Sequence, residues 1–447
     1  MTPIQPDSVF IVNLGCAKNL VDASVISQIL TSAGYQHAPS MREAKFVIIN
    51  TCGFIHDARV ESQEAISDAL KNRRKGQFVV ASGCLSQRLN ANFYAQFPGL
   101  DGLVGTRNLQ DVLTLLDKLS ESDNLRHNTL PAYPKLTFED NFSNTIIQGG
   151  SSYLKIADGC HRTCAFCAIP LIKGPLVSRS RESIIRDALL LQNAGVKEIN
   201  LIAQDVTAYG ADRGESDALA DLLTDLLPMI PNVPWLRLLY TYPGMVTERL
   251  IELMAGSNQL LPYLDMPLQH ADPAVLKAMS RPSNIEGVNE TIAKMRRLIP
   301  NLVVRTTMIV GYPNESEKSF KVLRSFIRNT EFDHLGVFTY SPEMDTASYD
   351  LADSIPMEVK EARMAELMEL QAYISLTRLK KLQGETLDML VEGINTEESL
   401  LVGRTYRDAP EIDGLAIAVG IAEEGDLVPV RITNTTEYDI IGELVKK

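Results

Sequence analysis

Residues 158–167 read DGCHRTCAFC and place Cys160, Cys164 and Cys167 at C-x3-C-x2-C spacing, directly after the largely apolar run Tyr153–Ala157. A loop this tight brings three thiolates around one inorganic cluster, because soft thiolates are the preferred ligands of iron–sulfur clusters. A cluster that only carries electrons normally has four protein ligands. Three ligands leave one iron open to a small molecule, so the spacing predicts a [4Fe–4S] cluster with an open iron.

Two other interpretations of this loop are a zinc knuckle and a disulfide. Zinc requires a fourth Cys or His at suitable spacing. His161 lies inside the loop, where it is badly placed to supply that ligand. A disulfide is disfavoured in a chain expected in the cytosol. The cluster is therefore the favoured interpretation.

Composition places the chain among ordinary soluble proteins. Its 447 residues suffice for about three domains, and 45% of them are hydrophobic. The N-terminus, Met1–Asp7, has no basic region followed by an apolar one, and no apolar run approaches the roughly 18 residues of a membrane span. We therefore expect a cytoplasmic protein without membrane contact. The net charge of −13 argues against a general nucleic-acid-binding surface.

One pattern occurs three times between about residues 8 and 120: a short apolar run followed closely by a cysteine. The runs and their cysteines are Val9–Val12 with Cys16, Phe46–Ile49 with Cys52, and Phe78–Val80 with Cys84. Each run is typical of a buried parallel strand, and helices are expected over Ser24–Ala33 and Glu61–Lys71 between them. The pattern predicts a doubly wound α/β domain.

In such a sheet the carboxyl ends of the strands share one edge, where ligands bind. Cys16, Cys52 and Cys84 can therefore converge although they are far apart in the chain. The alternative is three buried structural thiols, since free cysteines often lie in protein cores. Three cysteines at the same place relative to a strand favour a second three-cysteine cluster.

Six strand-like runs recur with helical segments between about residues 148 and 355. They are Tyr153–Ala157, Glu198–Ala203, Trp235–Tyr240, Tyr263–Leu268, Leu302–Val310 and His334–Tyr340. Six βα units predict a partial (β/α)6 barrel with its site at the C-terminal ends of the strands. Gln204, Asp205, Gln269 and His270 follow such ends and are candidate pocket residues. For each, a strand-end turn or a satisfied core contact is an equal alternative.

The remaining segments complete the predicted domain organisation. A polar linker is expected over 121–147, an amphipathic helix over Pro356–Leu382, and short strands over Leu387–Val391, Leu400–Arg404, Ala416–Val419 and Leu427–Ile432. The strands indicate a small antiparallel β-barrel. The predicted domains are 1–120, 148–382 and 383–447.

With these residues placed, the chain resembles the methylthiotransferases of the radical S-adenosylmethionine (SAM) superfamily over nearly its whole length. Within that family it most resembles the RimO type, which modifies an aspartate of small-subunit ribosomal protein S-twelve. The stretches that carry this resemblance are 14–22 (LGCAKNLVD), 201–205 (LIAQD), 261–270 (LPYLDMPLQH), 338–343 (FTYSPE), 403–406 (GRTY) and 409–414 (APEIDG).

The resemblance implies the activity and the cofactors. The open iron of the Cys160/Cys164/Cys167 cluster would chelate SAM, and an electron from an external donor would cleave it to a 5′-deoxyadenosyl radical. Cys16, Cys52 and Cys84 would hold a second [4Fe–4S] cluster carrying sulfur. SAM would serve as radical source and as methyl donor. The C-terminal barrel would be a TRAM-like domain, and Gln204, Asp205, Gln269 and His270 would line a SAM or substrate pocket.

Charge adds to the substrate assignment. Residues 384–447 carry 14 acidic and 5 basic side chains, a net charge of −9. Such a module would repel a phosphate backbone and attract a basic protein, which argues against a direct grip on RNA. We expect a basic ribosomal protein as substrate, met free or on the ribosome, with Glu411 and Asp413 on the docking surface. The alternative is an acidic surface that serves only solubility.

Two other functions stay open at this point. One is a transfer-RNA methylthiotransferase of the MiaB type, disfavoured by the acidic C-terminal segment and by the run around Cys16. The other is a non-enzymatic iron–sulfur electron carrier or sensor, disfavoured because each cluster would lack one protein ligand.

Overall fold

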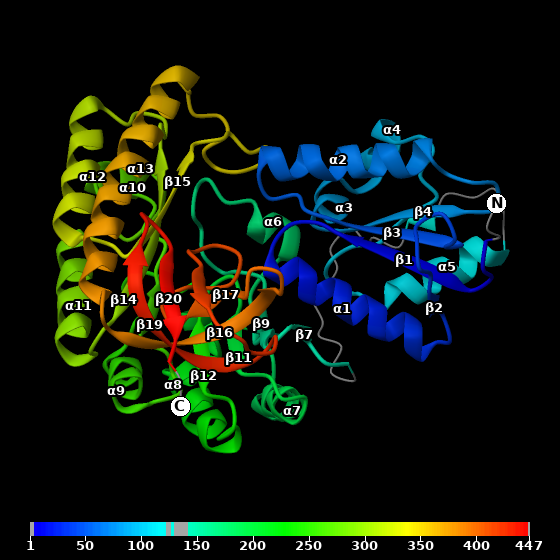
Figure 1. Cartoon of the computed structure of the whole chain (residues 1–447). Helices are drawn as coiled ribbons and strands as arrows, with labels where there is room; N and C mark the ends of the chain where they lie inside the picture. Colours follow the sequence, from blue (N-terminus) through cyan, green and yellow to red (C-terminus); the bar gives the residue numbers. More distant parts are fainter. Residues whose placement is uncertain (1–3, 122–126, 129–141, 446–447) are drawn as a thin grey trace. The chain divides into compact units, whose positions relative to one another are not determined.

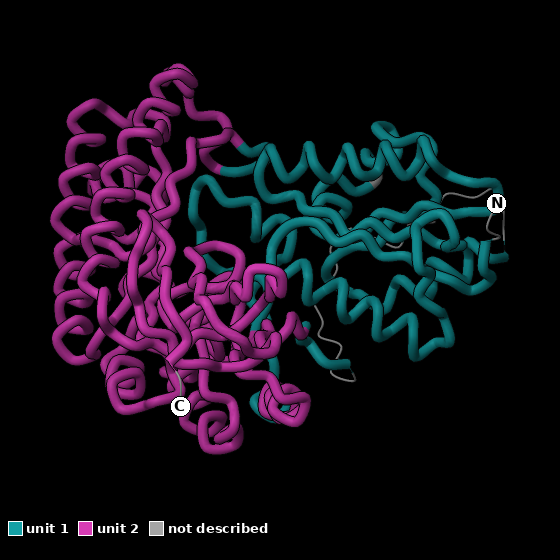
Figure 2. The backbone as a smooth tube through the Cα atoms, viewed as in Figure 1, with its two compact units in different colours: residues 1–146, 157–183, 343–346 teal, residues 147–156, 184–342, 347–447 magenta. Residues whose placement is uncertain are grey.

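The computed structural model describes residues 4–121, 127–128 and 142–445. It divides into two compact units (Figure 2). The first contains residues 1–146, 157–183 and 343–346, and the second contains 147–156, 184–342 and 347–447. The cysteine loop of residues 158–167 therefore belongs to the same unit as the N-terminal sheet. No helix among the described residues is long and apolar enough to cross a membrane.

The N-terminal sheet has the strand order β2-β1-β3-β4-β5-β6, and every pair is parallel. Its strands are β1 Ser8–Asn13, β2 Gln36–His37, β3 Phe46–Thr51, β4 Phe78–Gly83, β5 Gly102–Leu103 and β6 His127–Asn128, and its helices are α1 Ala17–Ser32, α2 His56–Lys71, α3 Cys84–Leu89, α4 Phe93–Gln96 and α5 Asp111–Glu121.

Helices cover both faces of this sheet (Figure 1). Successive residues of a strand point to opposite faces. Accordingly, Ile48 packs in one apolar cluster with Ile26 of α1, whereas Ile49 packs in another with Ile66 of α2. The predicted doubly wound α/β domain is confirmed.

The second unit contains a half-barrel of six parallel strands. β8 and β12 flank β11, β13 and β15 flank β14, and the two sheets meet at a bridge between Leu236 and Leu260. The strands are β8 Ser151–Lys155, β11 Glu198–Ile202, β12 Trp235–Leu238, β13 Tyr263–Asp265, β14 Val303–Val310 and β15 His334–Thr339. The helices between and after them are α7 Arg181–Asn193, α8 Ala218–Leu226, α9 Glu248–Gly256, α10 Pro273–Ala278, α11 Ile285–Leu298, α12 Glu317–Thr330 and α13 Met357–Leu379. The predicted partial barrel is confirmed.

The C-terminal segment forms a closed barrel in the order β16-β17-β18-β20-β19. Its strands are β16 Thr386–Asn395, β17 Leu400–Thr405, β18 Ala416–Val419, β19 Leu427–Thr435 and β20 Ile440–Leu444. Buried Met389, Leu401, Val430 and Ile440 form its core. The predicted small barrel is confirmed, but it is not antiparallel throughout, because β18 and β20 pair in parallel. β20 is also the strand that the sequence pattern missed.

The predicted linker over 121–147 lies largely outside the described residues. Two described strands fall within or across it. β6 pairs with β5 in the N-terminal sheet, and β7 Thr145–Gln148 lies beside β8.

The C-terminal barrel packs against the N-terminal ends of the half-barrel strands through buried charges. Arg404 donates to Glu198, the first residue of β11, at 2.6 Å, and Arg237 donates to the same carboxylate at 2.9 Å. Burial alone would raise the pKa of Glu198, but Arg404 and Arg237 outweigh it and hold the pKa at about 2. The stabilisation that this ionised carboxylate provides is present at neutral pH and is lost as the pH falls from about 4.5 to about 2.

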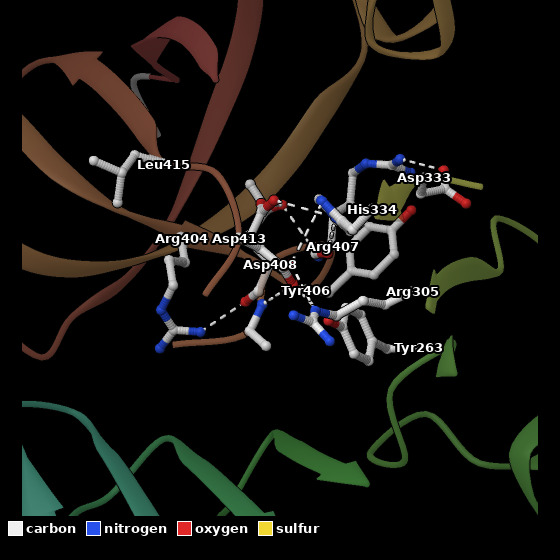
Figure 3. A network of polar contacts seen from close by, with 12 residues as sticks. Tyr263, Arg305, Asp333, His334, Arg404, Tyr406, Arg407, Asp408, Asp413 and Leu415 are labelled. Atoms are coloured by element: carbon white, nitrogen blue, oxygen red, sulfur yellow. Dashed lines mark hydrogen bonds and ion pairs between the residues drawn. The ribbon is translucent and has the colours of Figure 1, made fainter. Parts of the chain in front are cut away.

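Asp413 takes part in the same contact, which corrects its predicted place on the docking surface (Figure 3). Its side chain is only 1% exposed, accepts from Tyr263 Oη at 2.5 Å and pairs with Arg305 at 3.2 Å. His334, the first residue of β15, lies 3.6 Å from Asp413 and from Asp408. Glu411, by contrast, is exposed. Asp413 therefore fixes the C-terminal barrel in place and is unavailable to a partner.

Candidate active site

The three N-terminal cysteines occupy one edge of the sheet. Cys52 directly follows β3, Cys84 opens α3 directly after β4, and Cys16 lies between β1 and α1. These three strands are neighbours in the sheet, with Asn13, Asn50 and Ser82 in register near their ends. The predicted shared edge is therefore present.

Electrostatics and close contacts indicate that the three thiols lie near one another. Burial raises the pKa of Cys84, Lys173 opposes the shift, and Cys16 and Cys52 add to it. A Cβ placed on Gly15 would lie 3.0 Å from the Cys52 sulfur. The structure thus brings together three cysteines that are widely separated in the sequence.

Glycines allow the chain to approach this closely. Gly83 has a φ of +92°, and a Cβ there would lie 2.6 Å from both Asn50 Oδ1 and Thr51 O. A Cβ on Gly53 would lie 2.8 Å from the Leu85 backbone. A side chain at either position would push the cysteine loops apart, so the glycines set their spacing.

Asparagines and a serine hold the same loops. Asn19 Nδ2 on α1 donates to Leu14 O at 2.6 Å and to Thr51 O at 3.2 Å. Asn50 Nδ2 donates to Asn19 O at 2.8 Å. Ser62 on α2 accepts from Cys52 N at 2.9 Å. These buried bonds fix the backbone on either side of the thiols.

The chemistry of the donor sets fits an iron–sulfur cluster, because each group consists of three cysteines. Thiolates are the ligands that such clusters prefer.

The second cysteine group lies in the loop between β9 Ala157–Asp158 and α6 Ile169–Lys173. Cys160 N donates to Gly174 O at 3.1 Å, and Cys167 N donates to Cys164 O at 3.1 Å. Arg162 N lies 3.4 Å from the Cys160 sulfur, so a backbone donor already faces this thiol. All three cysteines are partly exposed.

Gly159 provides a test of how tightly this loop is packed. Its φ is +75°, and a Cβ there would lie 2.1 Å from Pro175 O. We expect Gly159→Ala to destabilise the protein by about 2–4 kcal/mol, because backbone strain and overpacking add. The control is Gly195→Ala, with a φ of +83° and nothing within 4 Å, which should cost only the strain, about 1–2 kcal/mol. Denaturant unfolding measures both, and equal losses would contradict the packing argument.

The four candidate pocket residues lie at the C-terminal ends of half-barrel strands. Gln204 and Asp205 follow β11, and Asp205 is buried and accepts from Thr207 Oγ1. Gln269 follows β13 with a φ of +76°, a left-handed backbone that a non-glycine residue adopts only under constraint. They therefore share one end of the half-barrel, opposite to the end that the C-terminal barrel contacts.

His270 is fully buried and held within its own loop. Its Nδ1 accepts from Asp272 N at 2.9 Å, and its Nε2 lies 3.7 Å from a carboxylate oxygen of Glu315. Glu315 accepts from Gly311 N at 2.7 Å. These contacts favour a role for His270 in positioning two strand-end loops.

Sequence reasoning missed two features, one in each unit. Tyr240 after β12 has a φ of +66°, and its N donates to the buried carboxylate of Asp265 at 2.9 Å. Lys173 is buried between Asp22 and Asp158. A positive φ at a tyrosine cannot be inferred from the amino-acid sequence. Asp158 stands beside the cysteine motif, but nothing in the sequence links it to Asp22.

Three known protein families match successive segments of the chain. The N-terminal residues 8–105 match the uncharacterized protein family UPF0004, residues 154–327 match the radical SAM superfamily, and residues 384–445 match the TRAM domain. A ribosomal protein uS12 methylthiotransferase RimO from Syntrophotalea carbinolica is 40% identical and aligns over 99% of this chain and 98% of its own length. The chain belongs to the uS12 methylthiotransferase family.

Other members of the uS12 methylthiotransferase family support this assignment. The RimO proteins of Pelotomaculum thermopropionicum and Acetivibrio thermocellus are 40% and 38% identical over 97% and 98% of this chain, each across 98% of the relative. The radical SAM superfamily implies SAM and one [4Fe–4S] cluster as cofactors. Cys160, Cys164 and Cys167 fall within the matched range.

Solved structures agree on the fold alone. The radical SAM methyltransferase TsrM from Kitasatospora setae has a TM-score of 0.55 at 13% identity, covering 74% of this chain and 72% of that one. This likeness supports a radical SAM fold for the chain.

Proposed function

We propose that this protein replaces a hydrogen on the β-carbon of an aspartate in ribosomal protein uS12 with a methylthio group. The observation that carries the proposal is the alignment of RimO relatives over nearly the full length of both chains. It covers both cysteine groups and the C-terminal barrel. A transfer-RNA substrate is not favoured, because these relatives are named for uS12.

The proposed chemistry divides between the two cysteine groups. Cys160, Cys164 and Cys167 would hold the cluster that binds SAM, and Cys16, Cys52 and Cys84 would hold a second, sulfur-carrying [4Fe–4S] cluster. When bound, the first cluster would pass on the electron that cleaves SAM, and the second would supply the sulfur that is transferred. Acid–base chemistry cannot remove a hydrogen from an unactivated carbon, so the protein's own part is to position and shield the reactants.

The remaining roles belong to the same proposal. Gln204, Asp205 and Gln269 would face SAM or substrate from the strand ends, with His270 holding the loops beside them. The electron would come from an external donor, SAM would also give the methyl group, and the reaction would take place in the cytoplasm. The domain division 1–120, 148–382 and 383–447 stays a prediction.

The exposed charge of the C-terminal barrel supports a basic protein partner. Two of its five basic residues, Arg404 and Arg407, are buried in contacts with carboxylates and do not contribute to the surface. Ten acidic residues of the described part of this segment are exposed: Glu385, Asp388, Glu397, Glu398, Glu411, Glu423, Glu424, Asp426, Glu437 and Glu443. Such a surface attracts a basic protein and repels phosphate.

Charge reversal tests this docking role. We expect Glu423, Glu424 and Glu437 changed together to Lys to weaken uS12 binding roughly tenfold at low salt, because long-range attraction is lost. Binding by the unaltered protein should weaken as salt rises, and the variant should be less salt-sensitive. Affinity for purified uS12, measured at low and at physiological salt, gives both quantities.

The matched control reverses Glu358, Glu361 and Glu369 on α13, which are also exposed and give the same net charge. Its affinity for uS12 should change less than that of the C-terminal variant. Equal effects of the two variants would show that binding depends on the net charge of the protein and not on a docking surface of the C-terminal barrel. Tighter binding of transfer RNA than of uS12 would contradict the substrate assignment.

A further inference from the structure

Lys173 is a buried cation at the end of α6, with a side chain only 2% exposed. Its Nζ donates to Asp22 Oδ2 at 2.7 Å, to Asp158 Oδ2 at 3.0 Å and to Thr106 Oγ1 at 2.5 Å. Burial alone would lower the pKa of Lys173, but Asp158, Asp22 and Cys84 together raise it well above its ordinary value. The lysine is therefore held charged in the protein interior.

The partners of Lys173 connect it to both cysteine groups. Asp22 lies on α1, six residues after Cys16, and Asp158 lies two residues before Cys160. One side chain thus contacts segments attached to each of the two candidate cluster sites.

The main chain next to Lys173 is hydrogen-bonded to the Cys160–Cys167 loop. Gly174, the next residue, accepts a hydrogen bond from Cys160 N at 3.1 Å. Arg107 of the N-terminal domain donates to Ile172 O at 2.7 Å and to Leu171 O at 2.8 Å, at the C-terminal end of α6. A shift of α6 would therefore move Cys160.

The energetics make this contact sensitive to the charge of Lys173. Two carboxylates with side chains 2% exposed lie within 3.0 Å of one ammonium. If the cation is removed, Asp22 and Asp158 repel each other in a site that water barely reaches. The segments that carry them, and with them Cys16 and Cys160, would be driven apart.

We propose that Lys173 is a positioning residue that sets the spacing between the Cys160–Cys167 loop and the Cys16/Cys52/Cys84 group. This inference rests on the proposed function, in which one group generates the substrate radical and the other delivers sulfur to it. Correct spacing couples the two events. Without it, SAM is still cleaved, but the sulfur is not in reach of the radical.

The test compares Lys173→Met, Lys173→Arg and Arg404→Met in the reconstituted full-length protein. Arg404 is the matched control, because it is a buried cation with two carboxylate partners, Glu198 and Glu392, at the opposite end of the half-barrel from the candidate pocket. The main readout is the ratio of 5′-deoxyadenosine formed to methylthiolated uS12. Iron content and the magnetic interaction between the two reduced clusters, measured by electron paramagnetic resonance, are readouts that do not depend on turnover.

We expect Lys173→Met to raise the ratio on the order of tenfold to a hundredfold, since misplacement by about 1 Å has effects of this size. The same variant should retain iron at both sites and show an altered magnetic interaction. Lys173→Arg, which keeps the charge, should stay close to the unaltered protein. Arg404→Met should lower stability without changing the ratio.

An unchanged ratio and an unchanged magnetic interaction in Lys173→Met would overturn the inference, as would an equal rise of the ratio in Arg404→Met. If Lys173→Met does not fold, Lys173→Gln, which removes the charge and keeps hydrogen-bond donors for the two carboxylates, decides: a raised ratio supports the inference and an unchanged one overturns it. If the unaltered protein makes no methylthiolated uS12, the proposed function has failed. In that case the magnetic interaction alone decides the inference.

Discussion

Replacing Cys160, Cys164 and Cys167 together by alanine is expected to abolish SAM cleavage altogether. The remaining iron should be about half that of the unaltered protein, because the other three cysteines can still hold a cluster. The physical reason is that these thiols are the proposed ligands of the iron that binds SAM. Iron and sulfide analysis, together with 5′-deoxyadenosine measured under reductant, tests both points.

The structure provides a control for this triple variant. His161 lies in the same loop and is exposed, and we assign it no ligand role. His161→Ala should keep its iron and its SAM cleavage. Loss of all the iron from the triple variant, with the fold intact by circular dichroism, would contradict two independent sites.

Replacing Cys16, Cys52 and Cys84 by alanine has the second large expected effect. SAM cleavage to 5′-deoxyadenosine should continue, about half the iron should remain, and methylthiolated uS12 should fall below detection. The reason is that these thiols belong to the proposed sulfur-carrying site and not to the radical-generating one. Product analysis by mass spectrometry in the same reactions measures the uncoupling.

A different outcome would assign the N-terminal cysteines to the core. If this second triple variant keeps its full iron content and still forms product, the three thiols are structural. Loss of SAM cleavage with the fold intact would make the two groups functionally inseparable. The proximity of the thiols at the shared edge of the sheet leads us to expect neither result.

The architecture could be predicted where strands are long and apolar. Phe46–Thr51 is buried throughout, and its four β-branched residues, Val47, Ile48, Ile49 and Thr51, favour a strand. β2 and β5 were missed because two residues carry no periodicity. α1 begins at Ala17, earlier than Ser24, because its first turn contains Lys18 and Asn19, which hide the apolar pattern.

The cysteines of the candidate site were predictable, whereas the buried charge of Asp413, at the other end of the half-barrel, was not. The cysteines stand at fixed places relative to strands, so topology brings Cys16, Cys52 and Cys84 to one edge. Asp413 was expected on the surface because acidic residues usually are exposed. It is buried because Tyr263, Arg305 and His334, all distant in sequence, supply its partners. Partners this distant in the chain cannot be recognised from the sequence around Asp413.

The most direct test of the central claim is mass spectrometry of uS12 after incubation with the reconstituted protein, SAM, a sulfide source and a reductant. The account predicts that one aspartate-containing peptide gains a single CH2S unit and that fragmentation places it on the aspartate side chain. The same reaction with transfer RNA should leave the nucleosides unchanged. Unmodified uS12 together with a methylthiolated adenosine would contradict the account.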